Sequence, residues 1–199
     1  MSIHFKQMGN YLPSTMSSQF NLKSFIVLLL LFSEGEIAHT SPYLPIPKHF
    51  EEVSLEYGIP TKIFWSIALV ESGWLRQNEI QPWPYTLRVG ESIYRFENSL
   101  DAGQKLQTVL QDGVSHIDID ISSVQLNYYW NKEYIEEIGY QRIFEDKYSL
   151  PRAAKILKDC LQTGTLSYCV GRYNAKTKSK QLIYRRKVAE TIRQISTIP

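Results

Sequence analysis

One glutamate stands at the end of an apolar segment, where its carboxyl group could take part in proton transfer. The segment 60–73 has helical spacing, with a proline in its first turn and a glycine at its stop. Phe64, Ile67 and Ala68 share one helical face with Glu71, and that face is expected to meet the core. Partial desolvation raises the pKa of a carboxyl group, so Glu71 could hold a proton near neutral pH and donate it. The alternative is an exposed glutamate at a frayed helix end.

Two further polar clusters follow Glu71-Ser72 along the chain. Gln125 and Asn127 come directly after an alternating segment, and Tyr173-Asn174 closes a short helical segment. Such side chains usually lie on the surface or cap helices when they are taken singly. The order and separation of the three clusters, and no single member, therefore indicate a site.

The chain has 199 residues and a formal net charge of +2, and 13% of its residues are aromatic. This length allows one domain with a full core, or a targeting segment followed by a domain of ~150 residues. The aromatic side chains could fill that core or line a groove for flat ligands.

The N-terminal part has a different character. The run 24–32 follows Lys23 and is uncharged and mostly apolar, which is short for a membrane span but typical of a secretory signal peptide. Cleavage is expected near Ala38, and an uncleaved membrane anchor is the alternative. Residues 1–38 are therefore predicted to be a signal peptide or anchor, 39–47 a proline-rich linker, and 48–199 the folded domain.

The folded domain is predicted to be mostly helical, an α+β fold with a small antiparallel sheet after the Glu71 helix. Strand-forming residues on both sides of Gly90-Glu91 predict a hairpin at 85–89 and 92–96, and strict alternation predicts a half-buried strand at 116–121. The segment 134–148 is ambiguous. Besides the Glu71 helix, helices are predicted at 48–57, from Asn98 or Ser99 to 111, near 124–130, and at 151–161, 166–173 and 181–195.

Asp118 and Asp120 alternate with Ile117, Ile119 and Ile121 in the strand predicted at 116–121. Successive side chains of a strand point to opposite faces, so the isoleucines are expected in the core and the aspartates in solvent. The two aspartates are accordingly interpreted as sheet or loop residues and not as a second catalytic carboxylate.

With these motifs the chain resembles the soluble lytic transglycosylases and the goose-type lysozymes. In that family a helix ends in Glu-Ser-Gly, a Gly-Leu-Met-Gln-Ile-Asn-type segment lines the cleft, and an Ala-Ala-x-x-Leu helix and a Tyr-Asn segment complete it. The corresponding segments here are 71–73, 122–127, 153–157 and 170–174. The segment 82–87, followed by a hairpin and a helix, is similar to an insertion in transglycosylases that are encoded with conjugation and mobile-element systems. The resemblance covers residues 46–174.

The resemblance implies a lysozyme-like fold and cleavage of peptidoglycan between N-acetylmuramic acid and N-acetylglucosamine, without a cofactor. Glu71 would protonate the leaving oxygen and then accept the proton of the muramic acid C6 hydroxyl, which gives a 1,6-anhydro product. Acetamido and hydroxyl groups of the substrate would be held by Ser72, Gln125 and Asn127, and Tyr173 and Asn174 would lie near the scissile bond. The aromatic residues that either form subsites or pack in the core are Trp83, Tyr128 and Trp130.

Two positions depart from the family pattern, because Ser122 and Val124 stand where the family has glycine and methionine. Glycine allows close approach and unusual dihedral angles, so Ser122 could narrow the cleft or shift Gln125. These departures leave open a non-catalytic, peptidoglycan-binding assembly protein. An aspartate well placed opposite Glu71 would instead favour a hydrolytic muramidase of the lysozyme type.

Cys160 and Cys169 are the only cysteines, and in an exported, periplasmic protein they could form a disulfide or remain two buried thiols. The histidines are scattered, so no metal site is predicted. The basic run 172–193 is interpreted as a solvated helix face, although nucleic-acid binding is a rival interpretation. The expected partners are peptidoglycan glycan strands and, from the resemblance, a secretion or conjugation apparatus. A membrane is expected only through an uncleaved N-terminal segment.

Overall fold

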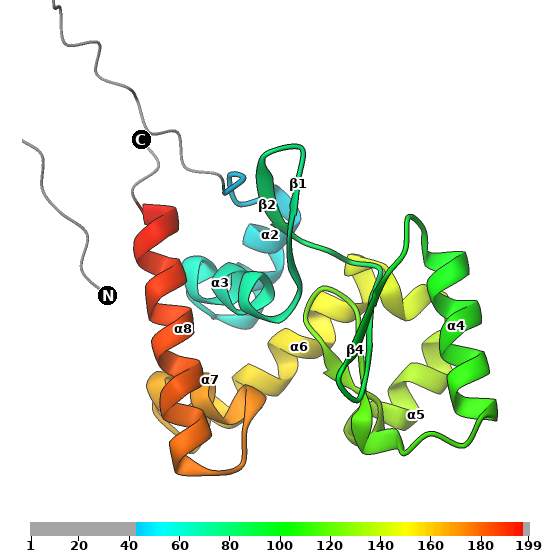
Figure 1. The fold of residues 1–199 in the computed structure, drawn as a ribbon. Helices are drawn as coiled ribbons and strands as arrows, with labels where there is room; N and C mark the ends of the chain where they lie inside the picture. The colour runs from blue at the N-terminus through cyan, green and yellow to red at the C-terminus, as the bar shows by residue number, and fades with distance from the viewer. Residues whose placement is uncertain (1–42, 197–199) are drawn as a thin grey trace, which may run out of the picture. The chain divides into compact units, whose positions relative to one another are not determined.

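A computed structural model describes residues 43–196, which form an α+β structure that is mostly helical with a small antiparallel sheet after α3, as predicted (Figure 1). The predicted signal peptide or anchor lies outside the described residues, as does the first part of the predicted linker. The helices are α2 Lys48–Tyr57, α3 Thr61–Ser72, α4 Ser99–Gln111, α5 Tyr128–Ile138, α6 Asp146–Leu161, α7 Leu166–Asn174 and α8 Lys178–Ser196. The strands are β1 Gly73–Arg76, β2 Glu79–Pro82, β3 Thr86–Val89, β4 Ser92–Arg95, β5 Ile119–Ile121 and β6 Leu126–Asn127.

Helix α3 carries Glu71 and is buried over most of its circumference. Pro60 is its N-cap, and Phe64, Trp65 and Ile67 are almost fully buried. Helices α2 and α8 pack against it, and α7 packs against α8 (Figure 1). A helix that is apolar all round must be enclosed in this way, so the end of α3 has a fixed position.

Gly73 ends α3 for a steric reason. Its φ is −49°, so left-handed freedom is not required, but a Cβ atom here would lie 2.4 Å from the carbonyl oxygen of Leu69. The chain therefore turns directly from α3 into β1, and only glycine fits at this step.

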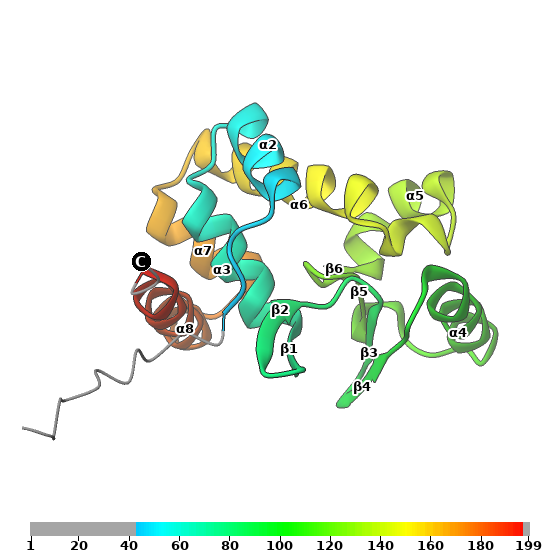
Figure 2. The same ribbon diagram turned by 90° about the horizontal axis from the view of Figure 1, so that it is seen from above.

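The four-stranded sheet has the order β4-β3-β5-β6, with all neighbours antiparallel. The hairpin of β3 and β4 confirms the predicted one, including its turn at Gly90-Glu91. In Figure 2 these strands lie between α3 and the pair α4 and α5. A second hairpin, β1–β2, was not predicted. Its two turn residues, Gln77 and Asn78, both have the positive φ that a two-residue turn of this kind requires.

The strand predicted at 116–121 is wrong in its first half. Residues His116–Asp118 form a 3-10 turn, and only Ile119–Ile121 is a strand, with all three of its residues buried. Ile117 is 47% exposed, whereas Asp120 is 8% exposed. Ile119 and Ile121 lie in the core, and Asp120 between them points to the other face of the sheet, which is also shielded from solvent, so the alternation does not mark a solvent-exposed face here.

The helix predicted near 124–130 is also wrong at its start. Ser122 and Gln125 have φ of 74° and 47°, which makes a tight turn between β5 and β6, and α5 begins only at Tyr128. Asn131 interrupts α5 with a non-helical φ of −123°. The ambiguous segment 134–148 contains the end of α5, a 3-10 turn and the start of α6.

The helices predicted at 48–57, 166–173 and 181–195 are confirmed with small changes of boundary, and α4 begins after Asn98, whose side chain caps it. Helix α6 begins five residues earlier than predicted, at Asp146, with Pro151 inside it. Cys160 and Cys169 form a disulfide that joins α6 to α7, as predicted. Within residues 43–196 no helix combines the length and apolar character needed to cross a bilayer.

Candidate functional site

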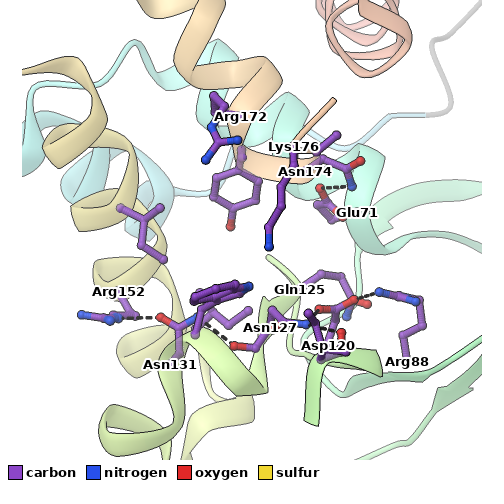
Figure 3. A pocket seen from close by; sticks show the side chains of 16 residues that line it. Glu71, Arg88, Asp120, Gln125, Asn127, Asn131, Arg152, Arg172, Asn174 and Lys176 are labelled. Carbon is purple, nitrogen blue, oxygen red and sulfur yellow. Dashed lines mark hydrogen bonds and ion pairs between the residues drawn. The ribbon is translucent and has the colours of Figure 1, made fainter. Parts of the chain in front are cut away.

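Glu71 lies in a pocket of about 530 Å³ between the end of α3 and the four-stranded sheet, with α5, α6 and α7 completing the walls (Figure 3). Polar and charged side chains dominate its lining. Besides Glu71 they are Arg88, Asp120, Gln125, Asn127, Asn131, Arg152, Arg172, Tyr173, Asn174 and Lys176, with Ile117, Leu126, Trp130, Ile156 and Ala175 as the other members. The pocket therefore unites six of the predicted site residues: Glu71, Gln125, Asn127, Trp130, Tyr173 and Asn174.

Two side chains from distant parts of the chain hold the Glu71 carboxyl group. The Tyr184 hydroxyl donates a hydrogen bond of 2.6 Å to Oε1, and the Asn174 amide donates to the same oxygen at 3.4 Å. Burial raises the pKa of Glu71 from 4.5 to about 7, although both hydrogen bonds and the charges of Arg88 and Lys187 lower it. Desolvation is the larger effect, so the net shift of the Glu71 pKa is upward, the direction expected from its apolar helical face.

Tyr184 is the main site residue that sequence reasoning missed. It is 4% exposed and lies on the inner face of α8 with Val188 one turn away. Burial raises the pKa of its hydroxyl well above 10, so Tyr184 acts as a hydrogen-bond donor and does not ionise. In the sequence, the i, i+4 spacing of Tyr184 and Val188 within an otherwise basic helix indicates that both residues lie on a buried face.

Tyr173 fixes the pocket wall opposite the sheet turn. Its hydroxyl donates a hydrogen bond of 2.7 Å to the carbonyl oxygen of Val124. Burial also raises the pKa of this hydroxyl, and the charge of Glu71 raises it further. The hydroxyl is thereby committed to the backbone beside Gln125, so Tyr173 joins α7 to the turn that presents Gln125.

Gln125 and Asn127 present their amides to the pocket from the turn and from β6. The Gln125 side-chain nitrogen donates to the Ser122 carbonyl oxygen at 2.8 Å. The Asn127 nitrogen donates to the carbonyl oxygen of Ile117 and to Asp120. Asn127 Oδ1 is buried, and none of the described residues donates a hydrogen bond to it. The side-chain nitrogens of both residues are thus engaged within the protein, and Asn127 Oδ1 is shielded from solvent.

Ser72, which was predicted to bind substrate, does not line the pocket. It is 1% exposed, and its hydroxyl donates to the carbonyl oxygens of Ala68 and Ser123 while accepting from the Trp83 backbone N–H at 3.1 Å. Its one hydroxyl hydrogen is therefore shared between two carbonyl oxygens, and the hydroxyl is shielded from the pocket. Ser72 therefore ties α3 to the turn at Ser123 and to the segment after β2.

The predicted aromatic candidates separate into two groups. Trp83 is 9% exposed, and its Nε1 donates to the Phe96 carbonyl oxygen while its ring packs edge-on against Trp74. Tyr128 is also buried, so both are packing residues outside the pocket lining. Trp130 lines the pocket, is 58% exposed, and lies 4.6 Å from the ammonium group of Lys176.

The expectation that Asp120 faces solvent is wrong, because Asp120 lines the same pocket as Glu71 (Figure 3). Its carboxylate accepts hydrogen bonds from Arg88 on β3 and from Asn127 on β6. Ile119 and Ile121 point to the core face of the sheet, so the side chain of Asp120 between them points to the opposite face, which borders the pocket. Asp118 remains exposed and is not part of the pocket lining.

The arrangement offers one proton donor with a raised pKa, several fixed amides and one engaged carboxylate. These groups suit acid–base chemistry on a polar, uncharged leaving group. Among residues 43–196 no cluster of three or more His, Cys, Asp and Glu side chains could hold a metal ion.

Comparison of the chain with protein-family models, with curated proteins and with solved structures gave no significant match.

Proposed function

We propose that this protein is a peptidoglycan lytic transglycosylase with a lysozyme-like domain. The observation that carries the proposal is Glu71, whose carboxyl group combines a pKa of about 7 with a place in an open, amide-lined pocket. The motifs that resemble the lytic transglycosylases lie around this one carboxyl group, although they are up to a hundred residues apart in the chain.

In the proposed reaction, protonated Glu71 donates its proton to the glycosidic oxygen as the bond to C1 of N-acetylmuramic acid breaks. The resulting carboxylate then removes the proton of the C6 hydroxyl, whose oxygen bonds to C1. The products are a 1,6-anhydromuramic acid end and a free hydroxyl group on the leaving sugar, and Glu71 is protonated again. A pKa near 7 suits a group that must serve first as acid and then as base.

The sugar would be held by amides on both sides of Glu71. Gln125 and Asn127 come from the sheet side, and Asn174 comes from α7. Trp130, on the pocket rim, would stack on a sugar face.

A hydrolytic muramidase is the second candidate, and the presence of Asp120 in the pocket favours it. A two-carboxylate hydrolase needs a free base or nucleophile opposite the acid. Asp120 is instead engaged by the Arg88 guanidinium and the Asn127 amide, so its carboxylate is not free to attack C1 or to hold a water molecule. We therefore prefer the reaction in which Glu71 acts alone.

The test compares wild type, Glu71→Gln and Asp120→Asn on purified peptidoglycan, with mass analysis of the released muropeptides. We expect 1,6-anhydro products from the wild type and a loss of activity of ~10²–10⁴-fold or more in Glu71→Gln, because an amide cannot transfer a proton. Asp120→Asn should keep the anhydro product. Reducing-end products that disappear in Asp120→Asn would establish the hydrolase instead, and absence of cleavage by wild type would favour a non-catalytic binding protein.

The proposed substrate also implies where the protein works. Peptidoglycan lies outside the cytoplasmic membrane, so we propose export to the periplasm, where the Cys160–Cys169 disulfide would be stable. Opening the wall for a secretion or conjugation apparatus is the role that the resemblance suggests. A tagged full-length protein found processed in the periplasmic fraction would support export, and unprocessed cytoplasmic protein would contradict it.

A further inference from the structure

Helix α8 carries far more positive than negative charge. Its sequence contains six lysines and arginines and a single carboxylate, Glu190, which is paired with Arg193. The helix packs against α3 and α7, and Figures 1 and 2 both show it at the border of the described fold. Its inner face is buried, and the cations that are exposed are Lys178, Lys180, Arg186, Lys187 and Arg193. None of these five lines the Glu71 pocket.

The outer face of α8 also exposes apolar side chains among these cations. Leu182 is 43% exposed, and Ile183 beside it is 55% exposed. A stripe of exposed residues at i, i+4, i+7 and i+11 runs along this face and consists of Leu182, Arg186, Ala189 and Arg193. Aliphatic side chains beside cations on one helix face match the surface of a bilayer, where phosphate groups lie above acyl chains.

The described part of the chain begins next to the same helix. The Tyr43 hydroxyl donates a hydrogen bond of 2.7 Å to Oε1 of Gln194, which lies near the C-terminal end of α8. The apolar run 24–32, predicted to belong to a signal peptide or anchor, precedes Tyr43 in the sequence. A chain that keeps its anchor would therefore enter the described fold beside α8, which is an independent reason for this helix to meet a bilayer.

We propose that the outer face of α8 binds the surface of a bilayer that contains anionic phospholipids. The exposed cations contact the phosphate groups, and Leu182 and Ile183 enter the boundary between headgroups and acyl chains. Nucleic acid is the less suitable occupant, because a phosphate backbone offers no partner for the two aliphatic side chains. This contact is separate from the reaction at Glu71 and does not depend on the proposed function.

An environment-sensitive fluorophore on α8 of the full-length protein tests the contact. Both native cysteines are held in the disulfide, so Ile183→Cys can be labelled selectively. The matched control is Ile93→Cys on β4, because Ile93 is 54% exposed and lies on another part of the fold. With vesicles of phosphatidylglycerol and phosphatidylcholine we expect a blue shift at position 183 and none at position 93. With phosphatidylcholine alone we expect no shift at either position, although the run 24–32 is the same in every sample.

Removing positive charge from this face should weaken the binding of the labelled protein. Lys178→Gln with Arg186→Gln should raise the lipid concentration at half-maximal shift about 10- to 30-fold, since each cation near an anionic surface contributes roughly fivefold. Lys132→Gln with Arg142→Gln, which removes two exposed cations on and after α5, should leave that concentration unchanged.

Three results would overturn the proposal. The first is a shift of the same size at positions 183 and 93, or with both kinds of vesicle. The second is no shift at position 183 with anionic vesicles, which would leave the outer face of α8 as a solvated surface. The third is a shift at position 183 on addition of duplex DNA but not of vesicles, which would show a nucleic-acid surface instead. Because the vesicle assay involves no cleavage, none of these results bears on the proposed function.

Discussion

The Glu71 carboxyl group is subject to two opposing influences, and their balance sets the pH at which it can act. Burial favours the protonated form, whereas the donors Tyr184 and Asn174 favour the carboxylate. With a pKa of about 7, the group can give up a proton and recover it within one catalytic cycle. A more buried glutamate would be too weak an acid, and a solvated one would be ionised before it could donate.

Removing the Tyr184 hydroxyl should raise the pKa of Glu71. In Tyr184→Phe the carboxylate loses its 2.6 Å donor, so protonation becomes easier. In the proposed mechanism the active form is the protonated one, so kcat/KM in the wild type should fall at pH above about 7. The falling limb of the profile should move to higher pH in Tyr184→Phe. The control is Tyr134→Phe, because the Tyr134 hydroxyl contacts the Tyr148 carbonyl oxygen and not Glu71, so the falling limb should not move in this variant. A limb that stays in place in both variants would contradict the role of Tyr184.

The raised pKa of Glu71 also predicts a cost in stability. In the unfolded chain the group ionises near 4.5, while in the folded protein it stays protonated up to about 7. The free energy of unfolding should therefore decrease as the pH rises through this interval and stay low above it. Glu71→Gln cannot ionise and keeps an acceptor for Tyr184.

We expect Glu71→Gln to exceed the wild type in free energy of unfolding by about 1–3 kcal/mol near pH 8, and by much less near pH 4. Urea denaturation at the two pH values measures the difference. An equal difference at both would mean that Glu71 has an ordinary pKa.

At the scale of the elements, the turn between β5 and β6 positions Gln125 through backbone conformations that serine and glutamine rarely adopt. Ser122 has a φ of 74° and is fully buried, at the position where the lytic transglycosylases have glycine. An L-residue in this region costs roughly 1–2 kcal/mol. The serine hydroxyl offers little in return, because its contact with the Val124 N–H is 3.5 Å long.

Ser122→Gly should therefore stabilise the protein by about 1 kcal/mol, once the greater freedom of glycine in the unfolded chain is subtracted. The neighbouring Ser123 is equally buried, but it lacks a positive φ and its hydroxyl binds Asp146 at 2.7 Å. Ser123→Gly should thus destabilise. Thermal and urea denaturation of the two variants would test the difference in sign, and a stability loss in Ser122→Gly would show that the backbone there is not strained.

Local patterns predicted the elements whose surroundings are simple. Helix α2 and the hairpin of β3 and β4 carry their own stop and turn residues, Gly58 and Gly90-Glu91, so their boundaries could be derived from sequence. The strand β5 could not, because its alternation was taken to mean one face in solvent, whereas all three of its residues are buried and Asp120 borders the pocket. That error moved Asp120 from the pocket to the surface.

At the scale of the whole molecule, the pocket depends on contacts between segments that are far apart in the chain. Ser72 and Tyr173 both bond the backbone of the Gln125 turn, from α3 and α7. Tyr184 approaches Glu71 from a helix more than a hundred residues away. The Tyr184 contact had no local signature beyond its helical spacing, which is why the candidate site could be predicted only in part from motifs.

The Cys160–Cys169 disulfide stabilises the part of this assembly that brings Tyr173 and Asn174 to Glu71. It closes a loop with a sequence separation of nine between α6 and α7, and Cys169 is 1% exposed. A loop of this size contributes roughly 2–3 kcal/mol by restricting the unfolded chain. The double variant Cys160→Ala, Cys169→Ala should lose about that much free energy of unfolding, and wild type in reductant should match it. The double variant itself should not respond to reductant, which separates the effect of the bond from other effects of reductant. Wild type that unfolds at the same urea concentration with and without reductant would show that packing of α6 against α7, and not the bond, keeps Asn174 beside Glu71.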